Sequence, residues 1–406
     1  MFGFAGKLLR VNLSKGETKQ ELLSGELARK YLGGQGFAAR ILYDELKPGI
    51  DPLSPENKIV LASGVLTGTP APVGNRCLIA SKSPLTGIWG DAVFGGWFGG
   101  ELKRAGFDGV IVEGVSNRPV YLWINDGDAE IRDASHLWGQ ETGPAQEAIL
   151  SEVGKARVLG IGPGGENLVN YGSAISELRF CAGRSGMGSV MGSKKLKAIA
   201  VKGSRPVAIA HREKLIAFTR QINKEIKANP SIATLTRYGT WNNLTPLQRL
   251  GILPTKNFQA GVIEGGERLE SEAMVEAILT ERQTCPNCPI FCRRVVTMEE
   301  PYQLSGMYGG PQYETVAALG SLVLNTDPPT IAKAHEVCNR YGIDTMSTGE
   351  CIAWAMECCE RGIDLGRPFP WGDAETILTL IEDIAYRRGV GAILADGVRK
   401  ASAKVG

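Results

Sequence analysis

The pattern of apolar and polar positions changes character near the middle of the chain. Before residue 205, short apolar runs bounded by glycine and polar residues favour β-strands. The predicted strands are Leu8–Asn12, Lys58–Ser63, Cys77–Ser81, Val110–Glu113, Val120–Ile124, Ala129–Arg132, Arg157–Ile161 and Lys197–Lys202. A helical pattern at Leu23–Leu42 interrupts them and is itself broken around Gly34. The first half is therefore predicted to be rich in β-sheet.

After residue 205 the apolar positions recur with the period of an α-helix. The predicted helices are Arg212–Ala228, Ser271–Glu281, Thr315–Leu324, Pro328–Tyr341, Ser347–Gly362 and Ala374–Tyr386. The change falls at Gly203-Ser-Arg-Pro206, and 406 residues are enough for two domains. We therefore predict an α+β chain, with a β-rich domain over residues 1–205 and an all-helical domain over residues 206–406.

Charge and composition narrow the class of protein. The chain has 45 basic and 43 acidic residues, so no strong field points to nucleic acid or to an anionic membrane. The apolar runs are shorter than a membrane helix needs, and the N-terminus lacks the pattern of a secretory signal. Nine cysteines in such a chain indicate reduced thiols or metal ligands. We expect a cytoplasmic protein with neither nucleic acid nor membrane as partner.

Three of the cysteines are grouped in one short stretch, Cys285-Pro-Asn-Cys288-Pro-Ile-Phe-Cys292. Closely spaced thiolates supply most ligands of an iron–sulfur cluster, and the two prolines suit a tight loop. The alternatives are a structural zinc loop or three buried cysteines. Zinc normally needs a second Cys or His pair nearby, and none follows. The three histidines, at positions 136, 211 and 335, show no zinc pattern with this loop.

Three glycine-rich segments in the first half carry cationic residues, at 73–87, 89–103 and 181–195. Glycine lets backbone N–H groups approach an anion, and Arg or Lys can bind its oxygens. Turn chemistry with solvated lysines is the alternative for any one of them. Because three occur beside a cluster motif, they favour a phosphate-bearing cofactor. In the helical half, Gly342 is predicted to end a helix, and Asp344 or Ser347 to cap the next.

One further glycine pattern, Gly160-Ile-Gly-Pro-Gly-Gly165, matches the dinucleotide-binding sequence. That fingerprint needs a helix to begin inside it and an acidic residue about twenty positions later. Pro163 and the non-helical stretch that follows argue against this, so we expect a turn.

In combination these motifs resemble the aldehyde:ferredoxin oxidoreductase family of tungsten enzymes, from Lys7 to the last residue. The resemblance implies that Cys285, Cys288 and Cys292 are three ligands of a [4Fe-4S] cluster. It also implies that Asn339-x-x-Gly342-Ile343-Asp344 is a pterin-binding motif, which more often begins with Asp. The further pterin contacts that it implies are Gly95, Gly96, Ala182, Gly183, Arg184 and Gly186.

The resemblance also implies cofactors and an activity. The cofactors are a tungsten bound by two molybdopterins (tungstopterin), the cluster, and Mg²⁺ bridging the pterin phosphates. The activity is oxidation of an aldehyde to a carboxylic acid, with electrons passing through the cluster to ferredoxin or an iron–sulfur subunit. Arg76 would lie between cluster and pterin; the alternative is a salt bridge to Asp91 or Glu101. Glu314 would be the general base beside tungsten; the alternative is an N-cap acid.

The sequence departs from the family at several points. Val93 stands where the family often has Asn, and neither an Asp-x-x-Gly-Leu-Cys motif nor the active-site His is found. We therefore expect that a third domain is lacking, through a split gene, truncation or degeneration. A homo-oligomer or a second chain would then complete the site, and helix 347–362, apolar over Ile352–Met356, would leave apolar surface exposed. A class II benzoyl-CoA reductase subunit and an inactive scaffold are the alternative functions.

Overall fold

The computed structural model describes residues 1–405 and divides the chain into two compact units. The first, here the sheet unit, comprises Met1–Ile226 together with Cys285–Pro289. The second, the helical unit, comprises Lys227–Thr284 and Ile290–Gly406. The boundary expected near residue 205 lies at residue 226 instead, because most of helix α7 (Arg212–Ala228) belongs to the sheet unit. The cysteine loop was expected in the helical domain, but its first five residues belong to the sheet unit.

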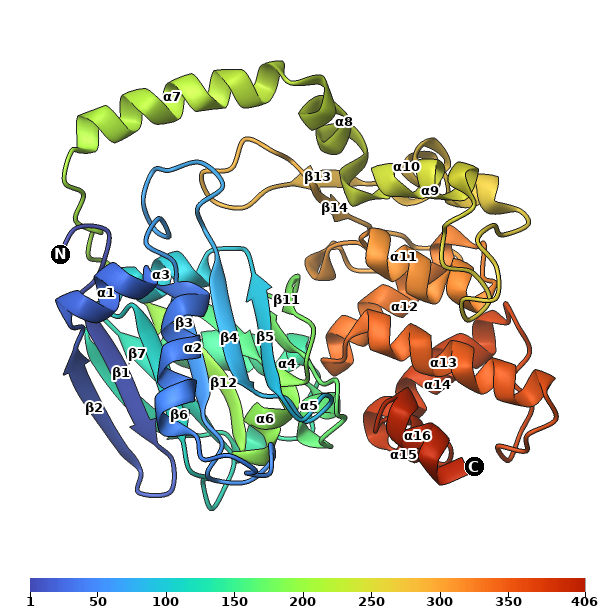
Figure 1. The fold of residues 1–406 in the computed structure, drawn as a ribbon, viewed down its shortest axis with the longest axis horizontal. Coiled ribbons are helices and arrows are strands. Elements are labelled where there is room, and N and C mark those ends of the chain that lie inside the picture. Colours follow the sequence, from blue (N-terminus) through green and yellow to red (C-terminus); the bar gives the residue numbers. More distant parts are fainter. Residues whose placement is uncertain (406) are drawn as a thin grey trace. The chain divides into compact units, whose positions relative to one another are not determined.

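Two six-stranded sheets form the sheet unit (Figure 1). The first has the order β2-β1-β6-β3-β4-β5, and its strands are β1 (Lys7–Asn12), β2 (Glu17–Leu22), β3 (Ile59–Ser63), β4 (Cys77–Lys82), β5 (Trp89–Phe94) and β6 (Gly109–Glu113). The second has the order β11-β10-β9-β12-β7-β8, from β7 (Val120–Asn125), β8 (Asp128–Asp133), β9 (Arg157–Gly160), β10 (Ala174–Ser176), β11 (Phe180–Ala182) and β12 (Leu196–Lys202). The pairs β1–β6 and β7–β12 are parallel, and the others are antiparallel.

The two sheets share a core, and helices cover their outer faces. Between the sheets, Ile79, Phe94, Leu122 and Ile199 pack with helices α3 (Phe98–Arg104) and α6 (Met187–Ser193). On the outer face of the first sheet lie α1 (Gly25–Tyr31) and α2 (Gly34–Glu45), and on that of the second lies α4 (Thr142–Val153). The charged strand β2 is fully exposed at one edge, where charge discourages pairing with another chain. At the opposite edge β5 contacts β11 of the second sheet.

A core of the helical unit includes Trp241, Leu269, Val316 and Ile331. Its helices are α8 (Pro230–Tyr238), α9 (Leu244–Leu250), α10 (Ser271–Ile278), α11 (Tyr313–Leu319), α12 (Pro328–Tyr341), α13 (Thr345–Glu360), α14 (Ala374–Tyr386), α15 (Gly391–Leu394) and α16 (Val398–Val405). Short 3-10 turns lie at Gly239–Asn243, Gly266–Leu269, Gly306–Tyr308 and Ser321–Val323, and one in the sheet unit at Ser135–Leu137. The unit is not all-helical, because β13 (Glu281–Gln283) and β14 (Arg293–Val295) form a hairpin on either side of the cysteine loop.

The α+β class is confirmed, with two sheets followed by helices, and three helices have the predicted bounds: α7, α12 and α14. Strand β5 was not predicted, because its residues were assigned to a glycine-rich segment. At Gly160–Gly165 a four-residue helix, α5 (Pro163–Glu166), follows β9 where a turn was expected. Proline is favoured at the first position of a helix, so Pro163 begins this helix and does not prevent it.

The apolar run in α13 is not exposed, contrary to expectation. Ile352, Ala353, Ala355 and Met356 are buried within the helical unit, so this helix leaves no large apolar patch. Throughout the described residues, no helix has the length and apolar character needed to cross a membrane.

Candidate active site

Arg76 contacts the first cysteine of the predicted cluster loop. Its Nη1 donates to Sγ of Cys285 over 3.7 Å, and both residues belong to the sheet unit. Gly95, directly after β5, makes room for this contact. A Cβ there would lie 2.5 Å from Arg76 Nη1 and 2.7 Å from Cys285 Sγ. A guanidinium donating to a sulfur is a contact that tunes a thiolate-ligated centre.

The expected salt-bridge alternative for Arg76 is wrong. Asp91 instead accepts from the side chains of Gln35 (2.6 Å) and Trp89 (3.1 Å). Glu101 accepts from the backbone N–H of Gly203. The Arg76 guanidinium therefore contacts the cysteine loop and neither of these two acids.

Gly96 lies against the side chains of Glu177 and Phe180. Its φ is +84°, and an added Cβ would lie 2.7 Å from Oε2 of Glu177 and from the Phe180 ring. Glu177 accepts from the backbone N–H of Trp97 and from Arg157, both at 2.8 Å. Burial raises the pKa of Glu177, whereas these two bonds stabilise its charged form. Glu177 and Phe180 therefore leave no space for a side chain at Gly96.

Two of the glycine-rich segments contact each other. The hydroxyl of Ser83 donates to the carbonyl of Ser185 over 2.8 Å. Gly186 has a φ of +76°, and a Cβ there would lie 2.1 Å from the carbonyl oxygen of Asn170. Ala182 is buried at the end of β11, and Arg184 just beyond it is exposed. Convergence of Arg184 on the cleft beside Arg76 stays a prediction.

The side-chain amines of Lys82 and Lys194 in these segments bind backbone carbonyls, not an anion. Lys82 Nζ donates to the carbonyl of Ile50 (2.6 Å), and Lys194 Nζ to that of Gly114 (3.1 Å). Lys194 is 1% exposed, and burial lowers its pKa to about 8. Both amines therefore hold backbone oxygens of the fold.

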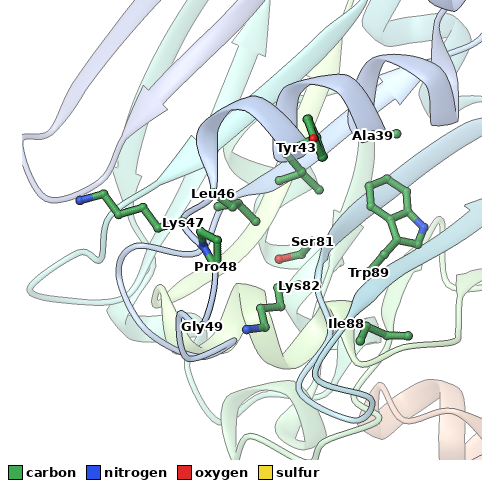
Figure 2. Close-up of a pocket in the computed structure, with 11 residues that line it drawn as sticks. Ala39, Tyr43, Leu46, Lys47, Pro48, Gly49, Ser81, Lys82, Ile88 and Trp89 are labelled. Carbon is green, nitrogen blue, oxygen red and sulfur yellow. The ribbon is translucent and has the colours of Figure 1, made fainter.

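A pocket of about 480 Å³ opens between α2 and the β4–β5 pair (Figure 2). Its lining is mostly apolar and includes Leu42, Tyr43 and Trp89. Lys82 pairs with Trp89 at this end of the two strands, whereas Cys77 pairs with Phe94 at the other. The pocket is therefore at the opposite end of β5 from Gly95 and Arg76.

In the helical unit, the predicted pterin motif forms the joint between α12 and α13. Gly342, with φ 67°, ends α12 as predicted. Asp344, one of the two predicted candidates, is the N-cap of α13 and accepts from the N–H groups of Met346 and Ser347. Ile343 between them is 1% exposed. The motif thus builds a sharp turn by capping two helices in succession.

Asn339, the first residue of the motif, contacts a buried histidine. Its Nδ2 donates to the carbonyl of Tyr308 (3.1 Å) and lies 3.2 Å from Nε2 of His335. Burial lowers the pKa of His335 to about 4, so the imidazole is neutral near pH 7. The same Nε2 lies 3.3 Å from the Tyr308 carbonyl, so the amide of Asn339 and the imidazole meet at this oxygen.

Glu314 is exposed in the first turn of α11, near the motif. The next residue, Thr315, shares a hydrogen bond of 2.8 Å with Thr345, which follows Asp344. The helices approach closely, since a Cβ at Gly349 would lie 2.3 Å from the carbonyl of Ala318. The N-cap of α11 is Gln312, so Glu314 itself is not the N-cap.

Known proteins match both units. The family model of the aldehyde ferredoxin oxidoreductase N-terminal domain matches residues 8–203, and that of domains 2 and 3 matches residues 217–406. The chain belongs to the aldehyde ferredoxin oxidoreductase family. The family resemblance predicted from the motifs is thereby confirmed.

Curated family members are similar along almost the whole chain. The tungsten-containing aldehyde ferredoxin oxidoreductases of Thermococcus kodakarensis and Pyrococcus furiosus are 44% and 43% identical, over 98% of this chain and 66% of theirs. The chain thus spans 66% of the length of these relatives. The WOR-like subunit of the Pyrococcus furiosus aliphatic sulfonate oxidoreductase is 31% identical over 100% of this chain and 68% of its own.

A solved structure is similar as well. The active-site complex BamBC of benzoyl coenzyme A reductase with 1,5-dienoyl-CoA aligns with a TM-score of 0.88 and 30% identity. The alignment covers 100% of this chain and 64% of that chain.

The cysteines that the family resemblance singles out are divided between the units. Cys285 and Cys288 belong to the sheet unit and Cys292 to the helical unit. In residues 1–405 no three Cys, His, Asp or Glu side chains are grouped to hold one metal ion. Ligation of a cluster by these three thiols stays a prediction. The remaining cysteines of the helical unit, Cys338, Cys351, Cys358 and Cys359, are helical as expected.

Three residues that hydrogen-bond to the backbone around this site were not predicted from the sequence. Glu177 gives no motif, and its φ of 50° is visible only in the structure. Asn75 and Asn287 contact backbone more than 200 positions away. The one local signal was Asn287 within the cysteine motif, because Asn adopts the left-handed conformation more readily than most residues.

Proposed function

We propose that this chain is part of a tungstopterin oxidoreductase that converts an aldehyde and water to a carboxylic acid, two protons and two electrons. Support comes from relatives at 42–44% identity that are named tungsten-containing aldehyde ferredoxin oxidoreductases. The observation that carries the proposal is the Arg76 guanidinium on the Cys285 thiol, with Gly95 making room. When bound, tungstopterin supplies the two-electron acceptor and a [4Fe-4S] cluster the one-electron relay.

The cluster would be held by Cys285, Cys288 and Cys292. The donor set suits such a cluster, because thiolates are its usual ligands and hydrogen bonds to sulfur are the usual means of tuning it. Asn287, with φ 55°, turns the loop between the first two thiols. The Cys288 N–H donates to the Cys285 carbonyl over 3.2 Å, so the turn is closed. Electrons leaving the cluster would pass to ferredoxin or an iron–sulfur subunit.

The family resemblance gives candidate pterin contacts within each unit. In the sheet unit the candidates are Gly95, Gly96, Ala182, Gly183, Arg184 and Gly186. In the helical unit they are Asn339, Gly342, Ile343 and Asp344. A cradle at Gly95 and Gly96 that any Cβ would obstruct is consistent with close approach of a ligand. Mg²⁺ bridging the pterin phosphates is part of the same proposal.

Glu314 is proposed as the general base. An exposed carboxylate beside the α12–α13 motif is available to accept a proton from water as it attacks the aldehyde carbon. The water oxygen becomes part of the acid, and the aldehyde hydrogen leaves as a proton plus two electrons.

The test is aldehyde oxidation by anaerobically prepared protein, followed with a viologen dye. Replacing Glu314 with Gln should lower kcat about 10²–10⁴-fold with tungsten and iron content unchanged. The matched control is Glu375→Gln, another exposed acid in the first turn of a helix, which should leave kcat unchanged. Equal rates in both variants would remove Glu314 from the mechanism.

Reduction of an aromatic CoA thioester is a second candidate. It is favoured by the benzoyl coenzyme A reductase structure, which aligns with the entire chain. The higher identity to aldehyde oxidoreductases ranks aldehyde oxidation first. Assaying both substrates on the same preparation decides between them, because only the true substrate should be turned over.

A further inference from the structure

Two loops of the sheet unit are joined by a pair of side-chain amides. One is the loop 64–76 between β3 and β4, which ends at Arg76; the other is the cysteine loop 285–289. Asn75 Nδ2 donates to the carbonyl of Pro286 over 2.9 Å. In the opposite direction, Asn287 Nδ2 donates to the carbonyl of Thr69 over 2.9 Å. These bonds link backbone segments separated by 211 and 218 positions.

The amide of Asn75 has only one workable orientation. Its Oδ1 accepts from the backbone N–H of Gly68 over 3.0 Å, and that N–H can only donate. Nδ2 must therefore face Pro286, whose carbonyl can only accept. Asn75 is 5% exposed, so neither half of its amide is readily replaced by water. An aspartate here would place an oxygen against the carbonyl.

The loop that carries Asn75 is itself fixed at several points. Lys103 Nζ donates to the carbonyls of Gly64 (2.6 Å) and Val65 (3.1 Å) at its base. Inside the loop, the buried hydroxyl of Thr67 contacts the carbonyl oxygens of Gly74 (3.1 Å) and Arg76 (2.8 Å). Asn75 therefore bonds the cysteine loop to a loop whose conformation is fixed. The cysteine loop has little regular secondary structure of its own.

We propose that Asn75 and Asn287 are positioning residues for the iron–sulfur site. Their two amide bonds hold residues 285–289 so that Cys285 stays on the Arg76 guanidinium and Cys288 keeps its place in the turn. Without them the loop must lose conformational freedom when a cluster binds, which weakens binding. The proposal rests on the proposed cluster, but the order of the loop itself can be measured without metal.

The experiment compares Asn75→Asp and Asn287→Asp with Asn12→Asp. Asn12 makes the same kind of bonds elsewhere in the sheet unit: Oδ1 accepts from Lys15 N–H, and Nδ2 donates to Glu113. Hydrogen exchange of the Cys288 amide is measured on metal-free protein. Both loop variants should exchange there about tenfold faster than wild type, and the control should not.

The second readout is the cluster after anaerobic reconstitution. The loop variants should retain less iron and show a lower reduction potential. A weaker N–H···S contact from Arg76 stabilises the reduced, more negatively charged cluster less, so the cluster is harder to reduce. If wild type binds no iron, the proposed function fails, while the exchange result still decides the loop proposal. Wild-type exchange at Cys288 in both loop variants would overturn the positioning role, as would an equal acceleration in Asn12→Asp.

Discussion

The sheet unit and the helical unit position their candidate residues in different ways. In the sheet unit, Arg76, Gly95 and Cys285 come from three distant segments and meet through side-chain contacts. In the helical unit, Gly342 and Asp344 lie two positions apart and act through helix caps. The first arrangement depends on the whole fold of its unit, whereas the second depends mainly on local sequence.

The two units also differ in where they place charged side chains. The sheet unit places charged groups in its interior, among them Lys197 with Glu166, and Lys103 on three carbonyls. The helical unit has ion pairs at its surface, such as Lys404 with Asp396, and it also buries Arg294 and a neutral His335. Breaking the buried ion pair of the sheet unit should therefore cost more stability than breaking an exposed ion pair of the helical unit.

The largest effect is expected at the buried ion pair of the sheet unit. Lys197 and Glu166 side chains are 1% and 4% exposed, and Lys197 also donates to the carbonyl of Gln140 (2.7 Å). Lys197→Met should cost about 3–5 kcal/mol, because it leaves a buried carboxylate without its partner. Urea unfolding measures the loss.

The matched control is Lys404→Met, which breaks the exposed pair with Asp396 in the helical unit. It should cost at most about 1 kcal/mol. Adding Glu166→Leu to Lys197→Met should restore much of the lost stability. Similar costs for the two lysine variants would contradict the contrast between the units.

Acid should weaken the helical unit through His335. Its pKa is about 4 in the folded state, below the ordinary value of 6.5 for histidine, so the unfolded chain binds more protons between these values. Stability should fall as the pH drops from 6.5 towards 4, by up to about 3 kcal/mol. His335→Gln should flatten this dependence in urea unfolding at several pH values, whereas the exposed His136→Gln should leave it in place.

These contrasts also explain how far sequence alone could go. The caps at Gly342 and Asp344 and the bounds of α12 and α14 were predicted, because capping and helical periodicity are local. The cysteine loop was recognised by its spacing, but its place in the sheet unit was not. No local pattern could assign Lys82 and Lys194 to backbone carbonyls, since that depends on which loops the sheets bring together.

A smaller effect is expected at Gly95. An alanine there would overlap both Arg76 Nη1 and Cys285 Sγ, and relieving that overlap should cost about 1–3 kcal/mol. The variant should also retain less iron after anaerobic reconstitution, because the Arg76–Cys285 contact is lost. The control is Gly139→Ala, a glycine with nothing within 4 Å of an added Cβ. It should leave iron content unchanged, although its φ of +86° adds strain of its own.

The smallest effect is expected at the helix cap. Asp344→Ala removes the acceptor for two backbone N–H groups and should cost about 1 kcal/mol. Thermal unfolding should register it as a modest decrease in Tm. Asp373→Ala, which removes the N-cap of α14 outside the motif, should cost about the same, but only Asp344→Ala should also lower tungsten content. Equal tungsten in the two variants would leave Asp344 with a capping role alone.

The central claim is that the chain holds a tungstopterin and an iron–sulfur cluster beside Arg76. Metal analysis of anaerobically prepared wild-type protein tests it most directly. We expect tungsten together with about four iron atoms per chain, with the iron lost in Cys288→Ala. A folded wild-type protein that contains neither metal, or a Cys288→Ala variant with unchanged iron, would contradict it.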